Sequence, residues 1–420
     1  MIFLLVVFFF ANQLLWLLPE FPGKPTDVGL LLIFAGIFYQ YVIRRQSFSI
    51  FSSPFSWLFF AYLFLVLIQA PLASINFNQS VLNGLVAVRQ QFYYLSFFLF
   101  ISVLKTPSDV FKFMKILTIL SVIALILAAI DTFGPNIVRN QFDMGDGVSK
   151  IRSSIAVPTV PALNLISVIF LWQVSIWSFA TDKSTRFWGR FLTVFLAGAH
   201  VWQQGRWRLL SIVVAALSML VLKRRIKLLF SLVLVGITAV VIAEYRMETN
   251  IFLNPFISGM ETVKEQKGSA AARMRQLEVD LEIFEKYPYV GGGTLAIRVN
   301  ESDFSYRRKE EISRKADLGY THLLKHLGIL GIVWLVFFYI LLWVYTILGS
   351  KNLPPEHQSI TAFGYSYLVY FIVSFVMENH LMFPHSIILV CLVAAILSVA
   401  SGEFNGNGEA NSNSTKSGLE

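Results

Sequence analysis

Long apolar segments recur along the chain, separated by short polar breaks. Their lengths approach the ~20 residues that an α-helix needs to cross a bilayer. Leu, Ile, Val and Phe follow one another in them without the strict alternation of outer-membrane strands. The pattern predicts an all-α fold, a polytopic membrane bundle of about twelve transmembrane helices that start near Met1, Val28, Pro54, Val81, Phe113, Pro158, Phe187, Arg206, Ile226, His322, Ile360 and Ile387.

Composition supports a membrane protein, and the distribution of charge orients it. Hydrophobic residues make up 56% of the chain and charged residues 14%. The opening run, Ile2 to Leu18, lacks the basic region and cleavage site of a signal peptide, so we expect a retained span with a cytoplasmic N-terminus. Alternate connections then carry the basic excess that marks the cytoplasmic side, at Arg44, Arg45, Lys105, Lys112, Lys115, Lys183, Arg186, Arg190, Lys223, Arg224, Arg225, Lys227 and Lys351. The net charge of +9 therefore mainly reflects membrane topology. Binding of nucleic acid would need a basic soluble face, and no soluble region has a clear basic excess.

Two connections are longer than ordinary turns, Thr132 to Val157 and Glu244 to Thr321, and both fall on the outer side. The predicted organisation is an N-terminal bundle (1–243), an outer loop or cap (244–321), C-terminal transmembrane helices (322–401) and a disordered tail (402–420). Within the cap, Ala270 to Tyr287 reads as an amphipathic helix. Its predicted apolar stripe is Met274, Leu277, Leu281 and Phe284, with Glu278, Asp280, Glu282 and Glu285 elsewhere.

Metal and cofactor chemistry lack sequence support. The six His and single Cys have no ligand spacing, and neither a Walker sequence nor G-x-G-x-x-G occurs. Cys391, inside the last apolar segment, is expected to be a small buried hydrophobic residue. These absences disfavour a nucleotide-sugar enzyme and an ATP-driven pump, and we expect neither a metal nor a cofactor.

Arginines at the outer boundary are the candidate anion ligands. Arg206 and Arg208 stand at the outer start of a predicted span, where a guanidinium could bind phosphate or anchor the interface. Arg89 lies some eight residues into its span, so it should pair with phosphate or with a structural partner. Arg273 shares a helix side with Leu277, whereas Arg275 can pair with Glu278. The run from Gly291 to Gly293 is a weak anion signal and more often a turn.

Polar groups cluster where the cap re-enters the membrane. A carboxylate or imidazole there could deprotonate an acceptor hydroxyl. Asp317 and His322 are the main candidates. The alternative roles are a helix cap and interfacial packing, and packing is the preferred interpretation of His326. Glu378 and His380, before the last span, are weaker candidates of the same type.

Three stretches together resemble the O-antigen ligase and polymerase family of class C glycosyltransferases. Arg206 with Leu210 is similar to its R-x-x-x-L motif. Arg273, followed by Tyr287-Pro288-Tyr289-Val290-Gly291-Gly292-Gly293, is similar to its arginine helix leading to P-x-x-G-x-G. Asp317 to Tyr320, then Leu327-Gly328-Ile329-Leu330-Gly331, is similar to its re-entry motif ending in G-I-x-G. The layout agrees over nearly the whole chain and the motifs over about a quarter.

One departure bears on the activity that the resemblance implies. Ligases of this family place a His-Asn pair where this chain has Asp317-Leu318, and His322 lies six residues before Gly328. An acidic residue followed three positions on by Tyr is closer to the polymerases. The resemblance therefore favours a polysaccharide polymerase, with O-antigen ligase as the alternative.

The resemblance implies inverting transfer of a glycan from undecaprenyl pyrophosphate to a sugar hydroxyl, without metal, at the periplasmic face of a bacterial inner membrane. Arg206 and Arg273 would bind the pyrophosphate, with Arg89 and Arg208 in support, and Asp317 or His322 would act on the acceptor. The partners would be the lipid-linked oligosaccharide, the bilayer and, as a candidate, a chain-length regulator protein. A flippase for the same lipid-linked sugars is the rival from another class, although its charges should lie deep in a central passage. A structural scaffold is the third reading, and the costly Arg89 counts against it.

Overall fold

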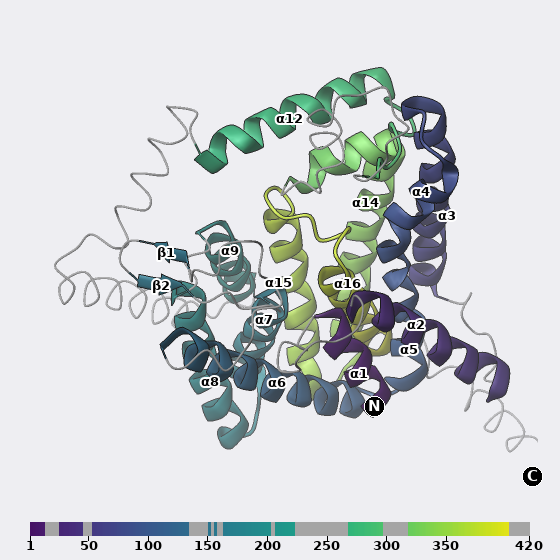
Figure 1. Cartoon of the computed structure of the whole chain (residues 1–420). Coiled ribbons are helices and arrows are strands. Elements are labelled where there is room, and N and C mark those ends of the chain that lie inside the picture. The colour runs from purple at the N-terminus through teal and green to yellow at the C-terminus, as the bar shows by residue number, and fades with distance from the viewer. Residues whose placement is uncertain are drawn as a thin grey trace, which may run out of the picture.

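The computed structural model describes residues 1–12, 25–44, 53–133, 150–152, 155–157, 163–202, 206–222, 268–296 and 318–402. Within these ranges the chain is predominantly α-helical (Figure 1). The predicted helix starts lie within six residues of observed ones, apart from that near Ile226, which lies outside the described residues. The fold is therefore an all-α, multi-pass membrane protein, as predicted.

The first half of the chain contains short and broken helices as well as long ones. They are α1 (Ile2–Ala11), α2 (Pro25–Phe38) with its π-helical continuation η2 (Tyr39–Ile43), α3 (Pro54–Phe77), α4 (Val81–Val88), the 3₁₀ helix η4 (Arg89–Leu95), α5 (Ser96–Val103), α6 (Pro107–Phe133), α7 (Leu163–Phe179), α8 (Lys183–Trp202) and α9 (Arg206–Leu222). A short antiparallel hairpin, β1 (Lys150–Arg152) with β2 (Ile155–Val157), lies between α6 and α7. The hairpin falls in the shorter predicted outer connection and is a small departure from a purely helical chain.

The remaining described helices form the centre and one end of the bundle. They are α12 (Gly268–Lys286), α14 (Gly319–Asn352), the 3₁₀ turn η5 (Pro355–His357), α15 (Gln358–Ser374) and α16 (Pro384–Ala400). Nearly every residue of α16 is buried. A helix that is apolar on all sides belongs in a core, and α16 packs against α5, α7, α14 and α15. Cys391, on α16, is buried as predicted, and its thiol donates to the Tyr94 carbonyl at 3.6 Å.

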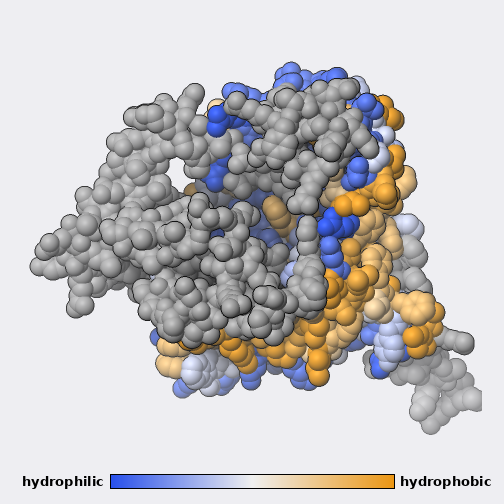
Figure 2. Space-filling model, in the orientation of Figure 1, coloured by the Kyte–Doolittle hydropathy of each residue, from blue (hydrophilic) through white to orange (hydrophobic). Residues whose placement is uncertain are grey.

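Hydrophobic side chains cover much of the outer surface. Five described helical segments are long and apolar enough to cross a membrane by length and composition: Pro25–Ile43, Pro54–Phe77, Val81–Val103, Pro107–Ile130 and Gly319–Asn352. On α3, Trp57, Phe64 and Ile75 are exposed. Figure 2 shows hydrophobic residues over the flank below α12, whereas hydrophilic residues gather at the top, where α12 lies. Such an apolar flank suits contact with lipid.

Connections at opposite ends of the bundle have different compositions. At one end, Asn352 donates to the Ser401 carbonyl at 2.6 Å, and the His357 ring contacts Phe111 on α6. Lys105 and Lys351 belong to this end. The opposite end carries α12, the start of α14 and the loop between α15 and α16 (Figure 1). The candidate site lies at the α12 end.

The predicted cap helix is confirmed, but its predicted apolar stripe is only half right, since Leu277 and Phe284 are half-buried. Met274 and Leu281, assigned to the apolar stripe, are exposed. Val279 and Ile283 instead pack with Ala73, Phe77 and Leu295 in a small core. Asp280, expected on the polar side, is fully buried beside them. Val279 and Ile283 are also four residues apart, so helical spacing alone allowed either face.

Candidate functional site

Helix α14 is broken at one glycine beside the candidate site. Gly328 has φ 60° and ψ −152° inside an otherwise helical segment. The break exposes two amide groups, and the N–H groups of Ile329 and Leu330 donate to the carbonyls of Pro288 and Tyr289 at 2.8 and 3.2 Å. The stretches Tyr287–Gly293 and Leu327–Gly331, about forty residues apart in sequence, are thus joined backbone to backbone.

Two other glycines permit this close contact. Gly291 and Gly293 have φ of +73° and +90°, values that favour glycine. A Cβ on Gly291 would collide with the backbone carbonyl of His326, and one on Gly293 would lie 2.5 Å from the Ala73 nitrogen. The loop after α12 therefore fits between α3 and α14 only without side chains at these positions.

Amide side chains at the end of α3 hold the same loop. Asn76 donates to the Gly292 carbonyl at 3.1 Å. Gln79 donates to the Thr294 carbonyl at 2.8 Å and accepts from the Ala296 N–H at 3.0 Å. These bonds satisfy backbone groups that a buried loop would otherwise leave unpaired. The loop is consequently fixed on both sides.

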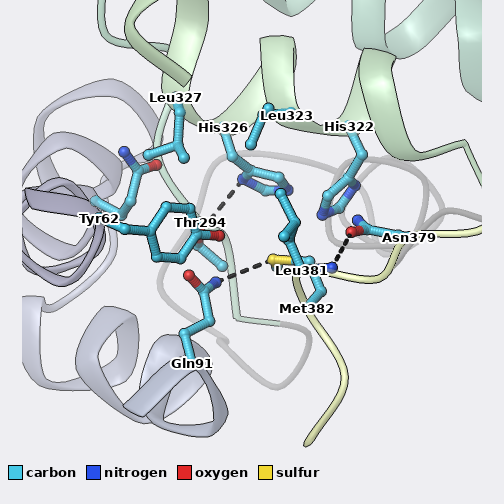
Figure 3. A pocket seen from close by; sticks show the side chains of 11 residues that line it. Tyr62, Gln91, Thr294, His322, Leu323, His326, Leu327, Asn379, Leu381 and Met382 are labelled. Atoms are coloured by element: carbon cyan, nitrogen blue, oxygen red, sulfur yellow. Dashed lines mark hydrogen bonds between the residues drawn. The ribbon is translucent and has the colours of Figure 1, made fainter. Parts of the chain in front are cut away.

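A pocket lies beside this junction (Figure 3). Amides, imidazoles and apolar groups line it, and none of the lining residues is Lys, Arg, Asp or Glu. His322 is 1% exposed and faces the loop that carries Asn379. The lining residues are Tyr62, Gln69, Gln91, Thr294, His322, Leu323, His326, Leu327, Asn379, Leu381 and Met382. Such groups can exchange hydrogen bonds with hydroxyls.

The hydrogen bonds of His326 fix its tautomer. Its Nδ1 lies 2.9 Å from the Gly293 carbonyl oxygen and 3.3 Å from Thr294 Oγ1. A carbonyl oxygen only accepts, so Nδ1 carries a proton and donates to it. The His322 and His326 rings are 4.2 Å apart, centroid to centroid. His326, predicted to pack, therefore both holds the glycine loop and lines the pocket.

Two of the predicted anion ligands contact protein carboxylates. Arg89 begins η4, and its Nε lies 3.0 Å from Asp27 Oδ1. Arg89 Nη1 also donates to the Val86 carbonyl at 2.7 Å. Arg208 pairs with Glu378 at 2.8 Å. Glu378 directly precedes the pocket residue Asn379 in sequence, so this ion pair places Arg208 beside the loop that lines the pocket.

The remaining predicted site residues are only partly described. Arg206 is the first residue of α9, and the orientation of its side chain lies outside the described part. Arg273 is exposed on α12. Asp317 lies outside the described residues, immediately before Leu318, the N-cap of α14. Of the two catalytic candidates, His322 lies in the described part of the chain and lines the pocket.

The sequence patterns did not predict the buried ion pair between Lys325 and Asp280 at this site. Lys325 Nζ lies 2.7 Å from Asp280 Oδ1, and the two side chains are 1% and 0% exposed. Lys325 stands between two imidazoles at the start of an apolar span. A cation in an apolar span is costly without a partner, so the position of Lys325 already indicates a buried counter-charge. Its partner, on another helix, could not be read from spacing.

Residues 191–338 match the family model described as O-Antigen ligase. This match supports the O-antigen ligase and polymerase family. The matched segment contains Arg206, Arg273 and both glycine stretches. The match supports an enzyme role of the ligase or polymerase type. It also agrees with the family resemblance of the sequence motifs. No curated protein matches the chain.

Proposed function

We propose that this chain is a polysaccharide polymerase of the O-antigen ligase and polymerase family. It transfers a glycan from undecaprenyl pyrophosphate to a hydroxyl of a second lipid-linked repeat, without metal, at the periplasmic face of the inner membrane. The observation that carries the proposal is the junction of Tyr287–Gly293 with Leu327–Gly331. Two stretches that resemble family motifs meet beside the pocket that contains His322.

The proposed reaction forms one bond and breaks one. The acceptor oxygen attacks the anomeric carbon, and its proton passes to Asp317 or His322 acting as base. The bond from that carbon to the pyrophosphate oxygen breaks, and the leaving group keeps the electron pair. Arg206 and Arg273 are assigned to the charge that develops there. Because Arg89 and Arg208 each contact a carboxylate, they are given supporting roles.

Surface polysaccharide from a strain lacking the gene tests the proposed activity. A gel separates lipid A core, core plus one repeat, and long ladders. Loss of long chains, with a single repeat still attached to the core, is the result expected of a polymerase. Unchanged ladders would refute both polymerase and ligase activity.

Ligase activity is the second candidate because the matched family model is described as O-Antigen ligase. The same gel separates the two. Loss of every core-attached repeat, with lipid-linked polymer accumulating, would indicate a ligase.

Alanine substitutions test the arginine assignment. Arg206→Ala and Arg273→Ala should each abolish long chains while protein level stays unchanged, because the leaving group loses its counter-charge. Arg275→Ala is the matched control for Arg273, since both are exposed arginines on α12. Normal ladders from both test variants would reject the assignment.

A further inference from the structure

The ion pair between Asp280 on α12 and Lys325 on α14 is enclosed on all sides. Both side chains are at most 1% exposed. Besides the ion pair with Lys325, the carboxylate accepts two hydrogen bonds: from Gln276 Nε2 to Oδ1 at 2.7 Å, and from Thr321 Oγ1 to Oδ2 at 3.1 Å. Directional contacts from two helices therefore converge on Asp280.

Stability alone does not account for a pair buried in this way. Moving two charges out of water costs as much as their attraction returns, and apolar replacements of buried pairs are often neutral or stabilising. What such a pair does supply is a defined geometry between its two elements. Here the elements are α12 and the first turns of α14.

Those two elements carry groups assigned to the transfer reaction. Asp280 lies seven residues after Arg273, which is about two turns along the same side of α12. Lys325 lies one turn after His322 and directly before His326. The Lys325 carbonyl also accepts the Gly292 N–H at 2.8 Å. The pair thus connects the Arg273 helix, the glycine loop and the imidazoles of the pocket.

We infer that Asp280 and Lys325 are positioning residues, which hold the Arg273 helix in register with the His322 segment of α14. This inference rests on the proposed transferase function. Neither residue contacts the reacting atoms in this assignment. Displacing catalytic groups by about 1 Å can cost ~100-fold in rate.

The test compares folding with turnover in purified full-length protein. The substrate is the lipid-linked repeat accumulated by a strain that lacks the gene. The double variant Asp280→Asn/Lys325→Met removes both charges, keeps similar volumes and retains an acceptor for Gln276. It should keep the wild-type Tm while polymer formation falls by about 10- to 100-fold. The loss should appear in kcat, with KM for the lipid-linked repeat nearly unchanged.

A matched control removes another buried polar contact between helices. Gln173 donates to Thr118 at 3.0 Å between α7 and α6, and both are buried away from the pocket residues. The variant Gln173→Leu/Thr118→Val should retain turnover.

Each outcome has a separate meaning. A folded double variant with full turnover would overturn the positioning role. A double variant that no longer folds would also overturn it, because the function of the ion pair would then be stability. An inactive wild-type protein would instead contradict the proposed transferase activity itself.

Discussion

Substituting Gly328 by alanine should disrupt the junction between the two glycine stretches. With φ 60° and ψ −152°, a residue with a side chain costs about 1–3 kcal/mol in backbone strain. The new Cβ would also lie 2.5 Å from the Pro288 oxygen and 2.6 Å from the Tyr289 oxygen. Both are backbone atoms, so relief requires the loop to move.

Movement of the loop would break the bonds from Ile329 and Leu330, each worth about 1 kcal/mol net. The combined loss is about 3–5 kcal/mol, which should lower the apparent Tm by about 5–10 °C. Thermal unfolding of the purified protein measures the effect, and the polysaccharide gel should show no long chains.

Gly198→Ala is the matched control for Gly328→Ala. A Cβ on Gly198 meets nothing within 4 Å inside α8. Alanine there should be neutral or stabilise by about 0.5–1 kcal/mol, because glycine loses more backbone entropy on folding. Equal Tm values for the two variants would show that the junction is not a constraint and would refute the reasoning.

Two further predictions concern charged groups. If Arg89 helps to bind the pyrophosphate, Arg89→Ala should shorten the polymer. Asp27→Asn removes only the carboxylate partner of Arg89 and should leave polymer length unchanged. Equal shortening by both variants would indicate that Arg89 has a structural role. Burial, and then the Arg208 guanidinium, lower the pKa of His380 from 6.5 to about 3. The unfolded chain then takes up this proton below pH 6.5 and the folded chain only near pH 3, so stability should fall as pH drops between these values, by up to about 1.4 kcal/mol per pH unit. His380→Asn should reduce the slope of Tm against pH in this range, and an unchanged slope would exclude a contribution from His380.

Local patterns predicted the elements well. The helices at Pro54 and Val81 begin at the predicted residues, and the cap helix matches within two residues at each end. Apolar length and polar breaks determine such boundaries, so a single sequence is sufficient. The break at Gly328 was not predicted, because it depends on carbonyls supplied by the distant residues Pro288 and Tyr289.

Partners distant in sequence were the part that patterns could not provide. Asp280 was placed on the polar face of its helix because carboxylates are rarely buried without a partner. Its partner Lys325 is supplied by α14. The sequence allows Arg89 to pair with either a phosphate or a structural partner. Asp27 on α2 is such a structural partner. His322 could be nominated from its position at the re-entry point, whereas the role of His326 depended on the carbonyl of Gly293.

The glycine run after α12 bears on where the pyrophosphate of the proposed donor would bind. Consecutive backbone N–H groups can bind an anion when they point outward together. Here the Gly291 N–H donates to the Tyr287 carbonyl at 3.0 Å and the Gly292 N–H to the Lys325 carbonyl at 2.8 Å. These donors are already satisfied within the protein, so the run serves as a contact between segments. The glycine run therefore offers no alternative to the proposed binding of the leaving group by arginine side chains. Arg273 is exposed on the helix that leads into this loop, so it is the first residue at which to test that proposal.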